Sequence, residues 1–501
     1  MLAILVAVHA IALAALYWRV SHYKGARKTE DAARTDRSAK DSTEKKLRLP
    51  PGPEPEDKES GNIGSIVEHG SLNEYLIHLH KTYGPIVKYY YGKNMAVSTY
   101  KPEHFKQQIH LYDRDETFFK SLEPILGDRG VGWRNGESAR RLRRSIDPYF
   151  NAAASNRYLP QFNDAAESKA REWRERAADA EDGWLLIADL FQEMKSVALE
   201  CAARLIFGDY FQDPARRQRL EQLHDIMMSE VQARMANPLL KMSPECAKAS
   251  AEARVLVEAA VSARPLAAQR AETGGRLVVD ELKDVCVDAE ELFSNAIGTF
   301  VGGYETTSIW ISRILHYVSG GGGASKEIQD KLHKELLDIL GPTEELAPYH
   351  IEQLKYCKAV VEEALRLGGI AAFTHRLSPT DLRIGDYNIP AGTWLMHDFE
   401  SGALNEDVFH DPKCFNPDRH LVKKPPSTLG CPRFGFAGGR LCPGKTFSYY
   451  EAYSMLATLI RQFEFKVDQS TRDVGHYYTL LTRPAANLRV YIKPRAQAAP
   501  N

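Results

Sequence analysis

One cysteine lies in a setting that favours chemistry. Cys442 follows the glycine-rich stretch RFGFAGGRL and precedes Pro443-Gly444, after which a strong helical pattern begins. The dipole at a helix N-terminus favours an anion, and a thiolate is both a nucleophile and a metal ligand. Gly438 lets the backbone approach a flat ligand closely, and Arg440 can pair with a carboxylate. Together these residues predict a bound group that carries both a metal and carboxylates.

A second candidate site interrupts a long helical pattern. GGYETTS, residues 302 to 308, places two glycines, an acid and hydroxyls among apolar neighbours. A glycine inside a helix costs about 1 kcal/mol relative to alanine, and a buried acid is costly unless it is used. Close helix packing, with Glu305 on a solvated face, is the alternative interpretation. We expect instead that the helix opens locally at Gly302-Gly303 for a small ligand or water, to which Glu305 and Thr306 relay protons.

A third set of residues predicts a structural clamp. Glu363-Ala-Leu-Arg366 puts an acid and a base on one helical face by its i, i+3 spacing. Alone this is weak evidence, because a chain of 501 residues with 26% charged residues contains such pairs by chance. FNPDRH, further along, offers Arg419 after a proline turn. A buried glutamate held by two arginines would support the structure rather than react.

These residues require a mainly helical frame. From about residue 135 to 340 the pattern is mostly helical, and the segment that contains GGYETT continues for some thirty residues, roughly 45 Å if unbroken. We expect it to be a central buried helix that ends at SGGGGAS. PIVKYYYGKNMAVSTY predicts a hairpin, and DLRIGDYNIPAGTWLMH predicts a short strand, a turn and a strand. The fold class is mainly α with a minor β component.

The N-terminal part predicts a membrane anchor. Residues 2 to 18 are apolar apart from one histidine and would span roughly 26 Å as a helix. Residues 19 to 48 hold ten Lys or Arg against five Asp or Glu, which places them in the cytosol by the positive-inside rule. A cleaved signal peptide is the alternative. We therefore divide the chain into an anchor (1–20), a charged tether with a proline-rich hinge (21–55) and one catalytic domain (56–501).

Composition excludes some functions. The net charge is −1, which gives no reason to expect nucleic acid as a partner. The seven cysteines are widely spaced and form neither a CxxC pair nor a cluster with zinc spacing, which fits a reducing compartment. A dinucleotide-binding glycine fingerprint is also missing from the sequence.

Taken in order, the motifs resemble those of the cytochrome P-450 superfamily of haem-thiolate monooxygenases. GGYETT is similar to the family's oxygen-activation motif, EALR to its ExxR, FNPDR to the arginine partner and GGRLCPG to the haem-binding loop. GSLNEYLIHLHKTYGPIV and IEQLKYCKAVVEEALR look most like family 20. The resemblance covers essentially the whole chain and implies the P-450 fold, with haem b as cofactor.

The resemblance also implies roles for individual residues. Cys442 would be the axial ligand of the haem iron, and Glu305 and Thr306 would deliver protons to bound dioxygen. The propionate and loop contacts would come from Arg143, Arg376, Arg440, Gly438 and Phe436. Glu363, Arg366 and Arg419 would form the clamp behind the ligand loop. The substrate pocket would be apolar and lined by Phe300, Val301, Ala371, Ala372, Phe373, Leu480 and Leu481.

Two departures from the family pattern concern the haem. Ala139 stands where the family often has a tryptophan, four residues before Arg143. The phenylalanine expected seven residues before the cysteine is replaced by Gly435, with Phe434 and Phe436 on either side. With Ala139 in place of the tryptophan, one propionate would lose a hydrogen-bond donor. With Gly435 in place of the phenylalanine, the backbone path of the loop would differ from the family pattern.

The expected activity is monooxygenation of a hydrophobic substrate. Electrons would come from NADPH through a separate cytochrome P-450 reductase or through cytochrome b5, at a basic face for which Arg140, Arg141 and Lys445 are candidates. The anchor places the protein in the endoplasmic reticulum membrane with a cytosolic catalytic domain. There are two alternatives. One is a reductase-independent isomerase or dehydratase that acts on a peroxide, and the other is a non-enzymatic haem or lipid-binding protein. The acid–threonine pair argues against both.

Overall fold

A computed structural model describes most of the chain after its N-terminal segment. The described residues are 48–116, 122–123, 127–132, 134–180, 182–236, 240–264, 276–422, 433–436, 438–478 and 481–496. The expected anchor and the charged part of the tether lie outside these residues. Within the part that is described, no helix combines the length and the apolar character that crossing a membrane requires.

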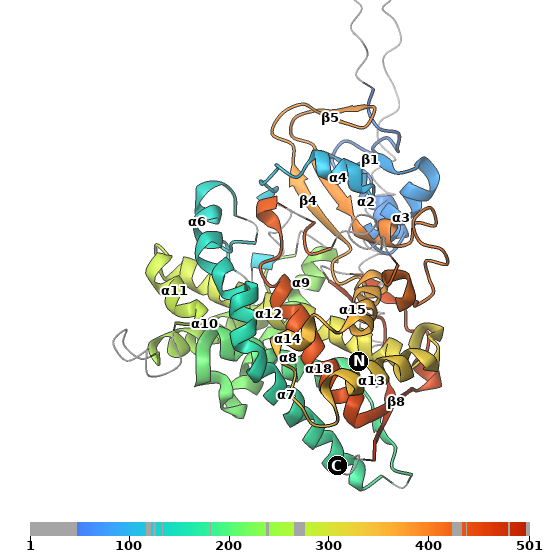
Figure 1. The fold of residues 1–501 in the computed structure, drawn as a ribbon. Coiled ribbons are helices and arrows are strands. Elements are labelled where there is room, and N and C mark those ends of the chain that lie inside the picture. The colour runs from blue at the N-terminus through green and yellow to red at the C-terminus, as the bar shows by residue number, and fades with distance from the viewer. Residues whose placement is uncertain are drawn as a thin grey trace, which may run out of the picture. The chain divides into compact units, whose positions relative to one another are not determined.

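Helices make up most of the structure and gather around one long helix (Figure 1). The expectation of a mainly α fold is confirmed. The α-helices are α2 (Ile63–Glu68), α3 (Leu72–Tyr83), α4 (Pro102–Gln107), α6 (Gly136–Ile146), α7 (Ala152–Ala178), α8 (Leu190–Phe207), α9 (Pro214–Ala236), α10 (Pro244–Ser262), α11 (Val278–Val285), α12 (Ala289–Val318), α13 (Lys326–Leu340), α14 (Pro348–Ile351), α15 (Lys355–Gly368), α16 (Phe399–Ala403) and α18 (Lys445–Gln462). The 3₁₀-helices are η3 (Asp147–Phe150), η4 (Gly208–Gln212), η6 (Gly321–Gly323), η7 (Pro417–His420), η8 (Gly438–Arg440) and η9 (Gln469–Thr471).

The expected thirty-residue central helix is α12. Its first turn is capped by the Asp288 side chain, which accepts a hydrogen bond from the backbone N–H of Glu291. The helix packs most extensively against α8 and also contacts α10, α11, α13, α15 and α18. Apolar residues along most of its length are buried, because neighbours surround it on several sides. It ends as expected at the glycine-rich segment, where Gly320 takes a left-handed conformation.

Small sheets lie at the edge of the helical body, and the largest lies with α2, α3 and α4 at one end of it (Figure 1). The expected hairpin is the antiparallel pair β1–β2, and the strand–turn–strand unit gives β5, β6 and β7. In the largest sheet the order is β1-β2-β7-β4, with β2 parallel to β7; the other sheets are β3-β11-β8, β5-β6 and β9-β10. The strands are β1 (Ile86–Tyr91), β2 (Asn94–Thr99), β3 (Leu185–Ile187), β4 (Phe373–Leu377), β5 (Leu382–Ile384), β6 (Tyr387–Ile389), β7 (Trp394–Asp398), β8 (Phe463–Val467), β9 (His476–Tyr478), β10 (Thr482–Pro484) and β11 (Val490–Pro494).

The proline-rich hinge is attached to the folded body. The Pro51 carbonyl accepts a hydrogen bond of 2.8 Å from the N–H of Lys88 on β1, and the Lys88 ammonium lies 2.7 Å from the Glu54 carboxylate. The Arg48 carbonyl accepts from Asn388 on β6. Residues 48–55 therefore belong structurally with the domain that follows them.

Candidate functional site

The cysteine loop has an unusual backbone. Phe434, Gly435 and Phe436 take positive φ angles of 58°, 77° and 74° in succession, although this region favours glycine. The turn is closed by the N–H of Cys442, which donates to the Phe434 carbonyl at 2.8 Å. A Cβ on Gly435 would lie 2.7 Å from the Arg440 carbonyl oxygen. Glycine at the position seven residues before the cysteine is thus what this loop path requires.

The two phenylalanines flanking Gly435 pack on different parts of the structure. The Phe436 ring contacts Phe105 on α4, with ring centroids 5.3 Å apart, and approaches His397 on β7. The Phe434 ring lies 6.0 Å from Trp310 on α12 and 5.6 Å from Tyr449 on α18. The pair therefore anchors the loop both to the sheet and to the helical core.

Cys442 lies where the sequence predicts, just before α18. Gly444 is the N-cap residue of that helix, and the backbone N–H groups of Gly444 and Lys445 favour the ionised form of the sulfur. Burial raises the pKa of the Cys442 thiol, although these amides and Arg143 act in the opposite direction. A thiolate at this depth needs a cation bonded to it, which suits the ligand of a metal better than a free nucleophile.

Arg440 and Arg376 are buried, and neither has a carboxylate partner among the described residues. The Arg440 guanidinium donates to the carbonyls of Tyr112, Val131 and Arg134, and it stacks 3.9 Å from the centre of the Tyr112 ring. The Arg376 guanidinium, from β4, donates to the carbonyls of His375 and Gly435. Within the described parts of the chain, neither forms an ion pair. Burial followed by the charge of Arg440 lowers the pKa of Arg376 to about 10.

Arg143 and Arg114 add to this positive region. Arg143 donates to the Leu441 carbonyl at 2.7 Å, next to the cysteine, and its other contacts are with Asp147 one helical turn later. Arg114 was not predicted as a site residue, since it lies in no motif. Burial and then the charges of Arg376, Arg440 and Arg143 lower its pKa well below the ordinary value. Four guanidinium groups thus converge near the cysteine loop and would favour an anionic ligand.

The acid–threonine pair lies on α12, but the helix does not open as expected. α12 is continuous, and the hydroxyls of Thr306 and Thr307 donate to the carbonyls of Gly302 and Gly303 at 2.8 and 2.9 Å. The expected opening is therefore wrong. A Cβ on Gly303 would come within 3.2 Å of Ala202 on α8, so this glycine serves close helix packing. At Gly302 a Cβ would meet no atom within 4 Å, so this glycine faces open space beside Thr306.

Glu305 is fully buried and has a charged partner that the sequence did not reveal. Arg483, on β10, donates to Glu305 Oε1. Glu305 Oε2 has no hydrogen-bond partner in the described structure. The acid is thus fixed through one oxygen, and the other remains available to a ligand or to water.

The structure brings the three clamp residues together. Glu363 is fully buried and accepts hydrogen bonds from Arg366 at 2.7 and 2.9 Å and from Arg419 at 3.0 Å. His420 Nε2 and the backbone N–H of Asn416 complete the clamp at 2.8 and 2.9 Å. Burial alone would raise the pKa of Glu363, but the hydrogen bonds from Arg366 and His420 lower it to about 2. His420 was missed, although it directly follows Arg419 in the sequence.

Comparison with known proteins agrees with this arrangement. The family model described as cytochrome P450 matches residues 50–488. The chain belongs to the cytochrome P450 family. It is 24% identical to cytochrome P450 20A1 of Rattus norvegicus over 415 residues, which are 82% of this chain and 86% of the relative. The human cytochrome P450 20A1 is 23% identical over 420 residues, 82% of this chain and 86% of the relative. Cyclooctat-9-en-7-ol 5-monooxygenase of Streptomyces melanosporofaciens is 24% identical over 411 residues, 77% of this chain and 83% of the relative.

Membership of the cytochrome P450 family makes this chain a haem-thiolate oxidoreductase that incorporates oxygen. The described residues fit a haem. The Cys442 thiol can bind iron, and the guanidinium groups around it can pair with carboxylates. Gly438 and Gly439 let the loop pack closely against Ile109 and Tyr112, because a Cβ at these positions would lie 2.5 Å from the Ile109 carbonyl oxygen and 2.9 Å from the Tyr112 ring. Cys442 would ligate the iron, and the guanidinium groups of Arg376, Arg440, Arg143 and Arg114 would face the propionates.

The predicted substrate-pocket residues of this cytochrome P450 fall into different environments. Phe300 has no exposed surface, and its ring packs against Phe207 and Tyr304; its place in the substrate pocket stays a prediction. Val301 is half-buried, and Ala371 is exposed. Ala372 is buried, while Phe373 and Leu481 are half-buried. Leu480 lies outside the described residues.

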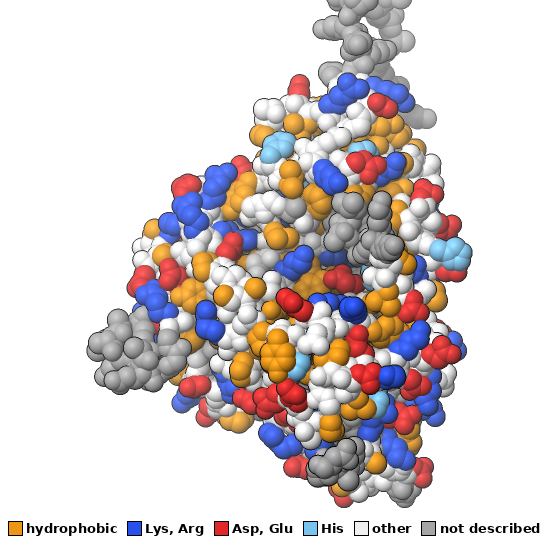
Figure 2. All heavy atoms as spheres, viewed as in Figure 1, with side chains coloured by type: hydrophobic (Ala, Val, Ile, Leu, Met, Phe, Trp, Pro, Cys, Tyr) orange, Lys and Arg blue, Asp and Glu red, His pale blue; other side chains and the backbone are white. Residues whose placement is uncertain are grey.

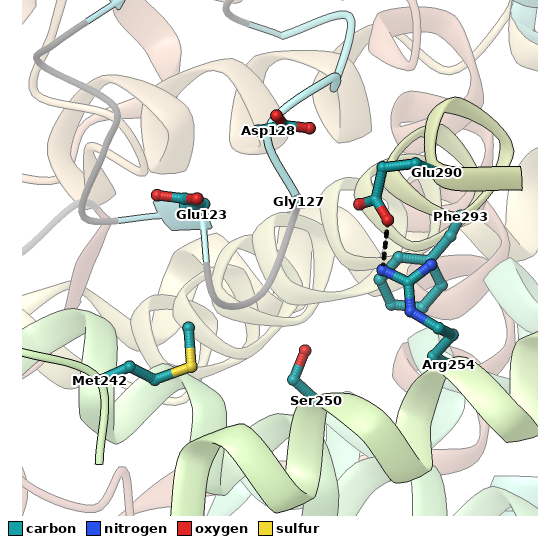
Figure 3. Close-up of a pocket in the computed structure, with 8 residues that line it drawn as sticks. All are labelled: Glu123, Gly127, Asp128, Met242, Ser250, Arg254, Glu290 and Phe293. Carbon is teal, nitrogen blue, oxygen red and sulfur yellow. Dashed lines mark hydrogen bonds and ion pairs between the residues drawn. The ribbon is translucent and has the colours of Figure 1, made fainter. Parts of the chain in front are cut away.

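A separate pocket of about 310 Å³ lies between α10, α12 and the segment before α6 (Figure 3). Arg254, on α10, donates to Glu290 at 2.7 Å and covers the face of Phe293. The wall is mixed in charge and contains none of the predicted substrate residues; it consists of Glu123, Gly127, Asp128, Met242, Ser250, Arg254, Glu290 and Phe293. This pocket is therefore distinct from the region around Cys442, Glu305 and Thr306.

Proposed function

We propose that this cytochrome P450 inserts one oxygen atom of O₂ into a hydrophobic organic substrate, with electrons that come from NADPH through a separate reductase. The observation that carries the proposal is the combination of Cys442 before α18 with the acid–threonine pair on α12. Haem b bound at the cysteine loop supplies the iron and the dioxygen chemistry. The protein must then supply protons, exclude water and orient the substrate.

Thr306 and Glu305 have different roles in the proposed delivery of protons. The Thr306 hydroxyl donates to the Gly302 carbonyl and lies beside the open space at Gly302, where it can bind and hold a water molecule or a small ligand. Glu305 keeps one free oxygen, Oε2, that can take up and release a proton. Isomerase or dehydratase chemistry on a peroxide needs no such external proton supply, which is why the pair favours monooxygenation.

A separate reductase is needed because the sequence lacks a dinucleotide-binding glycine fingerprint. Among the candidate docking residues, Arg141 is already paired with Glu291, to which it donates two hydrogen bonds of 2.8 Å. We therefore leave Arg141 out of the docking surface. Arg140 and Lys445 are exposed and lie over the rings of Tyr112 and Phe434. We include these two in the docking surface for the reductase and for cytochrome b5. Positive and negative side chains are interspersed on the face in Figure 2, which suits a local contact rather than a polyanion such as nucleic acid.

The membrane location is part of the same proposal. The apolar residues 2–18, followed by a predominantly basic segment, support a single N-terminal anchor in the endoplasmic reticulum membrane with the catalytic domain in the cytosol. Such an anchor would place the protein beside a membrane-bound reductase and give it access to apolar substrates.

The test starts with the spectrum of the reduced, carbon monoxide-bound protein. The thiolate–haem band is expected in the wild type and should be lost in Cys442→Ser; a folded wild type without the band would refute the proposal. Product formation with reductase and NADPH is then compared with turnover of organic peroxides without reductase. Turnover that needs only the peroxide would identify an isomerase or dehydratase. Thr306→Ala is expected to raise oxygen consumption per product formed, and unchanged coupling would remove Thr306 from the proton supply.

A further inference from the structure

On the side of α12 that faces α8 and α9, some polar groups have no partner among the residues that the structure describes. Tyr304 directly precedes Glu305; it is fully buried, and its hydroxyl has no hydrogen-bond partner in the described structure. The same holds for both ring nitrogens of His224 on α9. The two rings touch edge to face, with centroids 5.2 Å apart and planes at 71°. Buried polar groups almost always have a partner, and ordered water is the usual one where no protein atom serves.

The outer end of this cluster reaches solvent at Asp225. Its side chain is 50% exposed, and its Oδ1 atom lies 3.8 Å from His224 Nδ1. The Lys195 ammonium, on α8, lies 2.6 Å from the same oxygen and 3.2 Å from Glu221 Oε1. Burial would raise the pKa of Asp225, but His224 and Lys195 lower it, so the carboxylate is ionised and holds a proton from solvent only transiently.

The inner end is the unoccupied oxygen of Glu305. Arg483 donates to Oε1, while Oε2 is buried and has no partner in the described part of the chain. Tyr304 directly precedes Glu305 on α12 and its ring contacts His224, so Tyr304 stands between the two ends of the cluster. Burial, followed by the charge of Glu305, raises the pKa of Tyr304 well above its ordinary value, so the hydroxyl keeps its proton between transfers.

We propose that bound water joins Asp225, His224 and Tyr304 to Glu305 Oε2 and that this path carries protons from solvent to the acid of the oxygen-activation motif. Asp225 accepts a proton from solvent and passes it to one His224 nitrogen, while the other nitrogen releases a proton. Tyr304 accepts that proton and gives up its own, which ends on Glu305 Oε2. One proton moves, no bond to carbon changes and no oxidant is needed. The path rests on the proposed function, because it supplies the protons that monooxygenation consumes.

A purely structural role explains these residues less well. Tyr304 and His224 lie in an aromatic core with Phe300, Phe207 and Phe211, where phenylalanine or leucine would pack without an unpaired polar atom. The hydroxyl and the imidazole add nothing to such packing. Placed between an exposed carboxylate and a buried acid, they provide groups that can exchange protons at both ends.

The test compares Tyr304→Phe with Tyr89→Phe, which removes an equally buried and unpartnered hydroxyl in the sheet next to α3. The haem-loaded full chain is supplied with reductase and NADPH without added substrate, and the oxygen reduced to water is measured against the oxygen released as hydrogen peroxide. We expect this ratio to fall about tenfold or more in Tyr304→Phe and in His224→Gln, and to stay unchanged in Tyr89→Phe. Wild-type ratios in both path variants, or an equal fall in the control, would overturn the path.

A second measurement does not depend on activity. A high-resolution crystal structure of the haem-loaded protein should show ordered water within hydrogen-bonding distance of Tyr304 Oη and a His224 nitrogen, and a dry contact there would also overturn the path. Failure of the proposed function is recognised separately, because the reduced wild type would then lack the thiolate band with carbon monoxide. If the band is present and Thr306→Ala changes the ratio while Tyr304→Phe and His224→Gln do not, only the path is refuted.

Discussion

Replacing Glu363 by glutamine should destabilise the protein strongly, although the side chain would keep its shape. The carboxylate is fully buried and is the counter-charge of Arg366, which is itself only 3% exposed. The depression of the Glu363 pKa from 4.5 to about 2 corresponds to about 3 kcal/mol of stability. Removing one partner of a buried ion pair costs about 3–5 kcal/mol, because the other charge remains buried. We therefore expect Glu363→Gln to lower the free energy of unfolding by about 3–5 kcal/mol at pH 7.

The assay is urea unfolding followed by circular dichroism, with Asp338→Asn as the control. Asp338 also pairs with a cation, Lys334, but both side chains are more than half exposed, so its loss should cost less than about 1 kcal/mol. The contribution of Glu363 is present in full above pH 4.5, where the unfolded carboxyl is ionised, and it is lost as the pH falls through about 2. A loss below about 1 kcal/mol in Glu363→Gln, or one that does not shrink in acid, would refute this reasoning.

Further predictions concern the cysteine loop and two buried polar groups. Gly435→Ala adds a Cβ 2.7 Å from a backbone oxygen at a φ of 77°, so we expect this variant to lose haem faster than the wild type. The control is Gly475→Ala, where a Cβ has no neighbour within 4 Å. Equal rates of haem loss in the two variants would contradict the role given to Gly435. Burial raises the pKa of Glu400 to about 7, so the free energy of unfolding should fall as the pH rises from about 4.5 to 7. In the wild type the urea midpoint should therefore be lower at pH 8 than at pH 5. Glu400→Gln should abolish this difference. The buried hydroxyl of Ser294 has no partner among the described residues, so Ser294→Ala should raise the melting temperature or leave it unchanged. A clear decrease would mean that the hydroxyl binds water.

Local patterns in the sequence were sufficient to predict the elements that carry the site. The period of the apolar residues predicts α12, and the residues around Cys442 predict the start of α18, because both depend on neighbours within a few turns. The clamp also follows from local spacing, with Arg366 one turn after Glu363. The unbroken α12 shows where local reasoning fails: the cost of a glycine is small beside the packing of a thirty-residue helix, so Gly302 and Gly303 do not open it.

Contacts between distant segments that no motif marks could not be predicted. Arg483 meets Glu305 although 178 positions separate them, and no motif marks that arginine. The packing of Phe300 against Phe207 joins α12 to α8, and the sequence alone does not show this contact. The positive φ angles of Phe434 and Phe436 are likewise invisible in a residue pattern, since phenylalanine rarely takes them.

The clamp at Glu363 has a topological consequence. It bonds to Asn416, 53 positions later, and the intervening chain contains β4 to β7 with Arg376. These hydrogen bonds therefore act as a noncovalent crosslink that closes a long loop and limits the conformations open to it, as a disulfide would. Glu363 thereby restricts how far Arg376, an arginine predicted to bind a haem propionate, can move. Damage to the crosslink would first appear as weaker haem retention, before the helical body itself unfolds.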